Sequence, residues 1–201
     1  MPNMPESIFL IYALNKIGAV CNVIHPLSDE GEIKNAVELT NSTIIFTTDV
    51  SYATVKGVGI DRIVVCEVSN SMNPILKMAY NLKSRKQMKY ESDTIRWKNI
   101  IKDVKETVPT VKRDKNDAAV LIYSGGTTGK SKGIVLSNLC FNALATQCFD
   151  VCPEARPGAS MLSGLPIFHG FGLCVAIHAP LMLGMKCILL PKVDVKKLNE
   201  T

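Results

Sequence analysis

The chain has 201 residues, of which 47% are hydrophobic and 20% charged, and its net charge is +5. These values are ordinary for a globular protein, and the length allows one large domain or one and a half small ones, with ample core either way. The seven cysteines are an odd number without any C-x-x-C spacing, which argues against a disulfide framework or a zinc site and favours reduced thiols in a cytoplasmic protein. Five of them lie in apolar surroundings and are expected to be buried: Cys21, Cys66, Cys140, Cys174 and Cys187.

The first third of the chain alternates between helical and extended patterns. Pro5 suits the first position of a helix and Glu6 suits its positive end, so a helix is expected to run to about Ile17. A second helix is expected from an N-cap at Ser28 to about Leu39. Short buried strands are expected at 19–24, 42–48 and 61–68, with a short helix before the last of them.

The segment from Asn70 to Lys115 interrupts this alternation with a concentration of positive charge. It holds twelve Lys or Arg against five acids, a net charge of +7. A basic segment attracts nucleic acid or an anionic membrane. This one lacks the Gly/Arg repeats and interleaved aromatics of a nucleic-acid binder, and its pattern is weakly helical and irregular. We therefore expect no nucleic-acid binding and a solvated insertion on the rim of the sheet, with peripheral membrane contact left open.

From Asp117 the alternation of strands and helices resumes. Strands are expected at 118–123, 133–137, 159–166 and 185–191, and helices at 138–148, at 168–183 and from about Asp194. Short, continuously apolar strands separated by helices are typical of a parallel sheet covered on both faces. The sequence therefore predicts an α/β fold with a doubly wound, mainly parallel sheet and helices on both faces.

No targeting signal and no membrane span are expected. The N-terminal stretch has no basic n-region and carries Glu6 before a short apolar run. Residues 170–191 are long enough to cross a bilayer. They are interrupted by His178, Pro180, Gly184 and Lys186, however, and divide naturally into a buried helix and a strand.

The stretch YSGGTTGKSKG, residues 123–133, is close to a Walker A phosphate loop, G-x-x-x-x-G-K-[ST]. The first glycine of that pattern should fall at position 124, which is Ser124. In a Walker loop the lysine opens a helix, whereas here Gly133 and the following IVLS disfavour helix and favour strand. The stretch therefore predicts a strand–loop–strand hairpin and not a Walker loop.

The composition of the loop is nevertheless suited to phosphate. Glycines let the backbone bend and bring its N–H groups close to anionic oxygens, hydroxyls donate hydrogen bonds, and lysines supply positive charge. The residues concerned are Ser124, Gly125, Gly126, Thr127, Thr128, Gly129, Lys130 and Lys132. A flexible hairpin tip with two solvated lysines is the alternative.

The same stretch resembles the phosphate-loop signature of the adenylate-forming superfamily: acyl-CoA synthetases, luciferases and the adenylation domains of peptide synthetases. That signature is roughly [YF]-[ST]-[SG]-G-[ST]-T-G-x-[PAS]-K-G; Gly125 stands where many members have Ser or Thr, and Ser131 replaces the more usual proline. The N-terminal MPNMPESIFLIYALNKIGAVCNVIHPL is similar to an early segment of the family. LPIFHGFG, residues 165–172, resembles a motif of acyl-CoA synthetases and luciferases, which favours that branch over the peptide synthetases.

The resemblance implies roles for individual residues. Residues 124–128 and Lys132 would hold the β- and γ-phosphates of ATP, and Ser124 would also touch Mg²⁺. His169 would lie at the acyl pocket, near the carboxylate in the first step and the CoA thiol in the second, with Phe171 lining the same pocket. Lys132 and His169 are thus the candidate catalytic residues, although the residues alone favour a core histidine that caps a helix. Two further histidines match no family position and are expected to be structural: His25 and His178.

The implied reaction has two steps, in which a carboxylate attacks the α-phosphate of ATP to give acyl-AMP and pyrophosphate, and CoA then displaces AMP. The family's ribose-binding Asp, Glu-bearing motif and C-terminal lysine do not occur before Thr201. The whole chain, 1–201, is therefore expected to be part of the large N-terminal AMP-binding domain, complete at neither end and inactive alone. Two alternatives stay open: a ligase that loads an amino or aryl acid onto a carrier protein, and a non-catalytic module that binds nucleotide or acyl ligand. A P-loop NTPase is disfavoured by Ser124 and by the strand after the loop.

Overall fold

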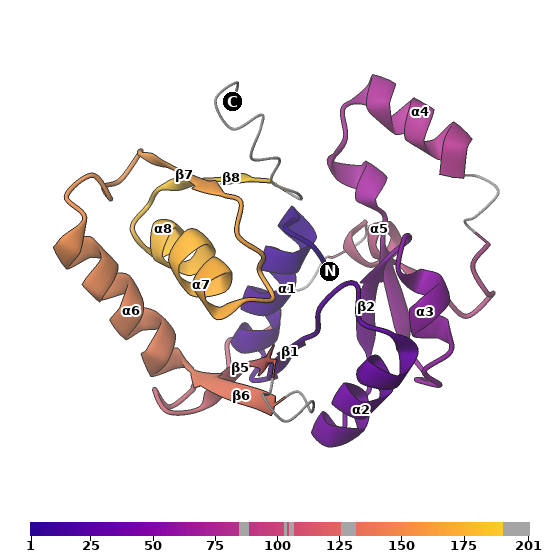
Figure 1. Ribbon diagram of the computed structural model, residues 1–201, viewed down its shortest axis with the longest axis horizontal. Helices are drawn as coiled ribbons and strands as arrows, with labels where there is room; N and C mark the ends of the chain where they lie inside the picture. The colour runs from indigo at the N-terminus through magenta and orange to yellow at the C-terminus, as the bar shows by residue number, and fades with distance from the viewer. Residues whose placement is uncertain (85–88, 103, 105–106, 126–131, 191–201) are drawn as a thin grey trace. The chain divides into compact units, whose positions relative to one another are not determined.

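The computed structural model describes residues 1–84, 89–102, 104, 107–125 and 132–190, and the chain divides into two compact units. Unit 1 comprises Met1 and Ile24–Thr107, and unit 2 comprises Pro2–Val23 and the described residues from Val108 onward. Figure 1 labels the helices and strands of both units.

Unit 1 is built on a parallel sheet with the strand order β2-β3-β4. Its strands are β2 Ile45–Thr48, β3 Ile63–Cys66 and β4 Ile95–Arg96. Its helices are α2 Glu30–Thr40, α3 Tyr52–Lys56, the 3₁₀ turn Val68–Ser71, α4 Pro74–Ser84 and α5 Trp97–Ile101. The central strand β3 is the most deeply buried, with Val64, Val65 and Cys66 fully covered. A small apolar cluster of Ile33, Val55 and Val58 packs helices α2 and α3 against this sheet.

Helix α2 begins one residue later than predicted, because its N-cap is Asp29 and not Ser28. The Asp29 Oδ1 accepts from the backbone N of Glu32 at 2.8 Å, and the backbone N of Asp29 donates to Glu32 Oε2 at 3.3 Å. This reciprocal capping box satisfies two N–H groups at once. The helix ends at Asn41, which adopts the left-handed conformation with φ 49°.

Unit 2 contains two small sheets, of strand order β1-β5-β6 and β7-β8. The strands are β1 Cys21–Val23, β5 Ala118–Ser124, β6 Lys132–Ser137, β7 Ser160–Ser163 and β8 Lys186–Leu189. The helices are α1 Pro5–Lys16, α6 Asn138–Val151, α7 Gly170–Leu173, the π-helical Cys174–His178 and α8 Ala179–Met182. Strands β1 and β5 are parallel, as are β7 and β8, whereas β5 and β6 are antiparallel. The core joins β5 to α6 and α7 through Val120, Ile122, Phe141 and Leu173.

The helix predicted at 168–183 is present, but its middle turn is π-helical. Pro180 has no N–H and cannot donate the α-helical bond to the carbonyl of Ala176. The backbone N of Ala179 instead donates to the carbonyl of Cys174, five residues back. The fully buried Ser163 Oγ donates to the Ala176 carbonyl oxygen at 2.6 Å, which ties this turn to β7.

The α/β fold class and the mostly parallel pairing are confirmed, with the strands distributed over three small sheets. The helix expected near Asp194 lies outside the described residues. The prediction of a buried Cys140 is wrong: its side chain is exposed, because the first turn of α6 faces outward and the buried side of this helix begins at Phe141. Within the described ranges, no helix is long and apolar enough to cross a membrane.

Candidate functional site

The glycine-rich stretch lies in the hairpin between β5 and β6. The two strands pair antiparallel, with Tyr123 opposite Gly133 and Ser124 opposite Lys132. The element after the loop is therefore a strand, as predicted, and the helix that a Walker loop requires is replaced by β6. A Cβ at position 133 would lie 3.2 Å from Leu121 Cδ2, so the glycine there lets β6 lie close to the Leu121 side chain.

Where the two strands meet the loop, Ser124 pairs with Lys132, so a hydroxyl-bearing residue lies opposite a cationic one. Ser124 ends β5 and is half-buried, whereas Lys132 begins β6 and is exposed. Gly125 is also exposed, and a Cβ added to it would meet nothing within 4 Å. The other predicted loop residues lie outside the described residues: Gly126, Thr127, Thr128, Gly129 and Lys130.

The segment that carries His169 is held by a buried asparagine from the start of the chain. Asn3 is 4% exposed, and its Nδ2 donates to the carbonyl oxygens of Ser163 at 3.0 Å and Leu165 at 2.8 Å. The backbone N of Ile167 donates to Asn3 Oδ1 at 2.8 Å. This clamp uses the whole amide and fixes the turn between β7 and α7. In the sequence, Asn3 was only one residue of the N-terminal stretch that is similar to an early segment of the family, and no role was predicted for it.

His169 is the N-cap of α7, and its Nδ1 accepts from the backbone N of Phe171 at 3.3 Å. The ring is exposed, so the structure confirms a capping position but not a core histidine. The Phe171 side chain is also exposed, at 54%. Both side chains thus lie on the surface of unit 2, where a ligand can reach them.

Two glycines bring this segment against the core and toward the hairpin. A Cβ at Gly172 would lie 2.0 Å from the carbonyl oxygen of Pro166, so no side chain fits there without moving the backbone. A Cβ at Gly170 would lie 3.2 Å from Ile122 Cδ1. Because Ile122 precedes Ser124 by two residues on β5, it points to the same face of the sheet. The start of α7 therefore packs on the strand that leads into the loop.

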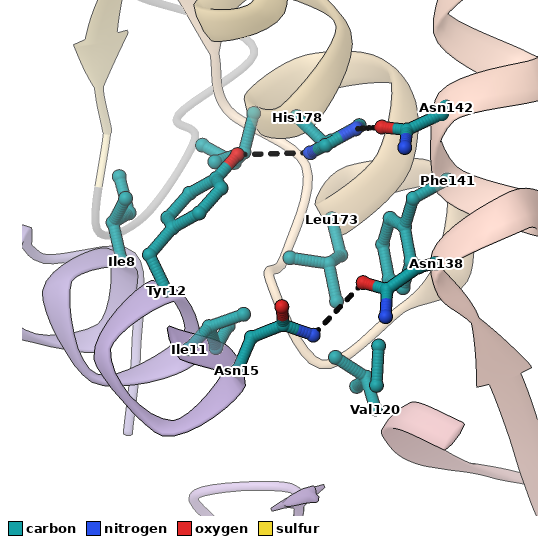
Figure 2. Close-up of a pocket in the computed structure, with 12 residues that line it drawn as sticks. Ile8, Ile11, Tyr12, Asn15, Val120, Asn138, Phe141, Asn142, Leu173 and His178 are labelled. Carbon is teal, nitrogen blue, oxygen red and sulfur yellow. Dashed lines mark hydrogen bonds between the residues drawn. The ribbon is translucent and has the colours of Figure 1, made fainter. Parts of the chain in front are cut away.

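Unit 2 also contains a cavity of about 240 Å³ between α1, β5, α6 and the C-terminal helices. Figure 2 shows Tyr12 and Asn142 pointing at His178 from opposite sides, with Oη to Nδ1 at 2.9 Å and Nε2 to Oδ1 at 3.2 Å. At the other end Asn15 Nδ2 donates to Asn138 Oδ1 at 2.9 Å. The lining holds apolar and neutral polar side chains and no Lys, Arg, Asp or Glu. This cavity therefore lacks the charges that would hold a carboxylate or a phosphate, and it includes none of the predicted site residues.

Burial shifts both titratable groups of this cavity away from their charged forms. It raises the pKa of Tyr12 to about 12 and lowers the pKa of His178 below its ordinary 6.5. The neutral imidazole fits the geometry when Nε2–H donates to Asn142 and Nδ1 accepts from the Tyr12 hydroxyl. His178 thus joins three helices, in agreement with the structural role expected for it.

A preformed metal cluster is absent from the described part of the chain, where no group of three or more His, Cys, Asp or Glu could hold an ion. Mg²⁺ keeps most of its water and is bound mainly through substrate phosphates with few protein ligands. The Ser124 hydroxyl at the end of β5 is the predicted protein contact for it.

Comparison with known proteins gives a single family. The profile of the family described as AMP-binding enzyme matches residues 1–200. The chain is 26% identical to a long-chain-fatty-acid–CoA ligase of Bacillus subtilis, over 96% of this chain and 37% of the relative. It is 29% identical to 4-coumarate–CoA ligase-like 8 of Arabidopsis thaliana, over 96% of this chain and 32% of that protein. The chain thus spans about a third of the length of the curated relatives it matches.

Solved structures agree on the fold. The anthranilate CoA ligase AuaEII in complex with anthranoyl-AMP superposes with a TM-score of 0.76 at 18% identity, covering 96% of this chain and 34% of that one. ATP-bound MatB from Rhodopseudomonas palustris superposes with a TM-score of 0.72 at 22% identity, covering 100% of this chain and 36% of that one. At these identities the likeness establishes the fold.

Proposed function

This chain belongs to the family of AMP-binding enzymes, and from that premise we propose that it is part of the large N-terminal domain of an ATP-dependent acyl-CoA synthetase. The observation that carries the proposal is the β5–β6 hairpin, in which Ser124 and Lys132 face each other on either side of a glycine-rich loop. The relatives named as CoA ligases support the same reaction class.

The hairpin supplies the side of the reaction where pyrophosphate departs. Attack of the carboxylate on the α-phosphate transfers negative charge to the β- and γ-phosphates. Loop N–H groups, hydroxyls and the Lys132 ammonium would offset this charge from fixed positions, which is the most effective form of electrostatic catalysis. Mg²⁺, when bound, supplies further positive charge at the phosphates.

The exposed segment around His169 supplies the acyl side in this proposal. Its ring caps α7 and is open to solvent, and Phe171 exposes an aromatic face beside it. The contact between Gly170 and Ile122 supports placing the carboxylate near the phosphate loop, since it joins the two segments through β5.

The test measures acid-dependent exchange of pyrophosphate into ATP by an enzyme that contains this chain. Lys132→Ala should slow the exchange by about 10- to 100-fold, because a hydrogen bond to a charged group contributes roughly 1.5–3 kcal/mol. Lys186→Ala is the matched control, since Lys186 is equally exposed in unit 2 and begins β8. Near-normal exchange by Lys132→Ala would refute the role of the hairpin. Products that appear on a carrier protein and not on CoA would identify the carrier-loading ligase instead.

A further inference from the structure

Helix α4 of unit 1 exposes a row of large apolar side chains. Ile75, Met78 and Leu82 are 78%, 64% and 66% exposed. Their spacing of three, four and seven residues places them on one face of the helix. None of the residues of α4 is buried, and Figure 1 shows the helix projecting from the body of unit 1.

The opposite face of α4 is attached to the body of unit 1. The Tyr80 hydroxyl donates to Asp49 Oδ2 at 2.8 Å, and Asp49 Oδ1 accepts from the backbone N of Val68 at 3.0 Å. Burial and the neighbouring Asp49 carboxylate raise the pKa of Tyr80 to about 12, so the hydroxyl keeps its proton at neutral pH. At 3.6 residues per turn, Tyr80 lies roughly opposite the midpoint between Ile75 and Leu82. The anchor therefore holds the apolar row pointing away from the unit.

The sequence of α4 and of the residues after it, as far as Tyr90, carries charge of one sign. Between Pro74 and Tyr90 the sequence contains five Lys or Arg and no Asp or Glu. Lys83 and Lys89 are exposed. A helix with an apolar face and surrounding cations is the pattern that binds at the interface of an anionic membrane.

We propose that α4 docks on the surface of a membrane that contains anionic lipid. Ile75, Met78 and Leu82 enter the boundary between headgroups and acyl chains, and Lys83 and Lys89 lie near the lipid phosphates. A second copy of the chain fits this face poorly, because it would bring two acid-free basic segments together. The apolar row of one short helix is also smaller than a stable protein interface requires. This surface belongs to unit 1, whereas the hairpin residues belong to unit 2, and the docking proposal does not depend on the proposed reaction.

The test is co-sedimentation of the 201-residue chain with vesicles of phosphatidylcholine alone or mixed with phosphatidylglycerol. The chain should bind the mixed vesicles, and added salt should weaken binding because it screens the cations. The double variant Met78→Gln/Leu82→Gln should lower the partition coefficient at least about tenfold, since two buried apolar side chains are lost. Lys83→Glu should lower it by at least about fivefold, since each basic residue contributes about a factor of five. Leu39→Gln in α2 is the matched control: Leu39 is 62% exposed, and its replacement should leave binding unchanged.

Three results would overturn the proposal. The first is absence of binding to the mixed vesicles. The second is equal binding to both kinds of vesicle, which would remove the role of anionic lipid. The third is a dimer in sedimentation equilibrium that Met78→Gln/Leu82→Gln dissociates, which would make the apolar row an interface between copies. Circular dichroism of each variant separates loss of docking from loss of the helix.

Discussion

At the residue scale, the side chain of Asn3 connects the start of the chain to the turn that carries His169. It does so over sequence separations of 160 to 164 residues, with both amide donors and the acceptor used. A buried amide of this kind is hard to replace, because any smaller side chain leaves backbone groups of the turn without a partner. Asn3 therefore positions the turn that carries the candidate residue His169.

We expect Asn3→Ala to lower the free energy of unfolding by about 2–4 kcal/mol, since buried carbonyl and N–H groups lose their partners. Urea denaturation followed by circular dichroism measures this directly. Asn81→Ala, at an exposed position of α4, is the control and should change stability by less than about 0.5 kcal/mol. An equally small effect of Asn3→Ala would mean that the clamp contributes little to the fold.

Two substitutions at His169 separate its capping bond from a role at the acyl pocket. Asparagine is a good N-cap and can keep the hydrogen bond to the Phe171 N–H, whereas alanine cannot. If the ring acts on the acid, His169→Asn and His169→Ala should both slow acid-dependent turnover of the enzyme containing this chain, by about tenfold. Nucleotide binding, measured by calorimetry, should change little. Full activity of His169→Asn would show that only the cap matters.

At the element scale, the network of Tyr12, His178 and Asn142 joins α1, the C-terminal helices and α6 around one cavity. The three helices contribute neutral polar groups there and otherwise apolar contacts. His178 lies on the C-terminal side of the π turn, close to Pro180, where the helix departs from regular geometry. This network makes the packing of the three helices sensitive to the charge of a single imidazole.

The stability of the folded chain should therefore fall as the pH is lowered below 6.5, the ordinary pKa of histidine. Burial lowers the pKa of His178 below 6.5, so the unfolded chain takes up a proton at higher pH than the folded chain does. The contribution of neutral His178 is fully present above 6.5 and is lost as the pH falls below that value. The midpoint of thermal unfolding, measured from pH 7.5 to 5.5 (about the range where histidine titrates), should fall more steeply for the wild type than for His178→Gln. Parallel profiles would contradict this account.

At the scale of the whole molecule, the chain consists of two compact units, and its matches cover it almost entirely while covering about a third of the relatives. The residues proposed for chemistry belong to unit 2, and α4 belongs to unit 1. The hairpin proposed to bind phosphate and the helix proposed to dock on a membrane thus belong to different units.

The 201-residue chain alone should form acyl-CoA at no measurable rate. Adenylation requires the carboxylate, the α-phosphate and a cationic partner held together, and the effective molarity collapses when one partner is missing. The assay supplies ATP, Mg²⁺, CoA and a panel of short, long and aromatic acids, and follows AMP and thioester. Lys132→Ala serves as the control for contaminating synthetase, since contamination would be insensitive to it. Sustained acid-dependent AMP production that Lys132→Ala abolishes would show that this chain contains a complete site.

Local patterns in the sequence were sufficient for several features. The β-branched IVLS after Gly133 predicted a strand in place of a Walker helix, and β6 confirms it. The positions of glycine and proline predicted the succession of helices and strands and thereby the α/β class. One long motif, residues 123–133, predicted the family. These succeed because the information lies within about ten neighbouring residues, where backbone preference decides the outcome.

Other features depend on contacts between distant residues, and only the tertiary structure decided them. Asn3 bonds to residues 160 to 164 positions away in the sequence, and no local pattern specifies these partners. The exposure of Cys140 was misjudged, because burial depends on which face of a helix meets the core. The exposure of the apolar row of α4 likewise depends on which face of the helix meets unit 1, and Tyr80 bonds to Asp49 on the opposite face. The sequence by itself determined the helices and strands and the glycine-rich hairpin between β5 and β6. Packing determined which side chains these elements expose.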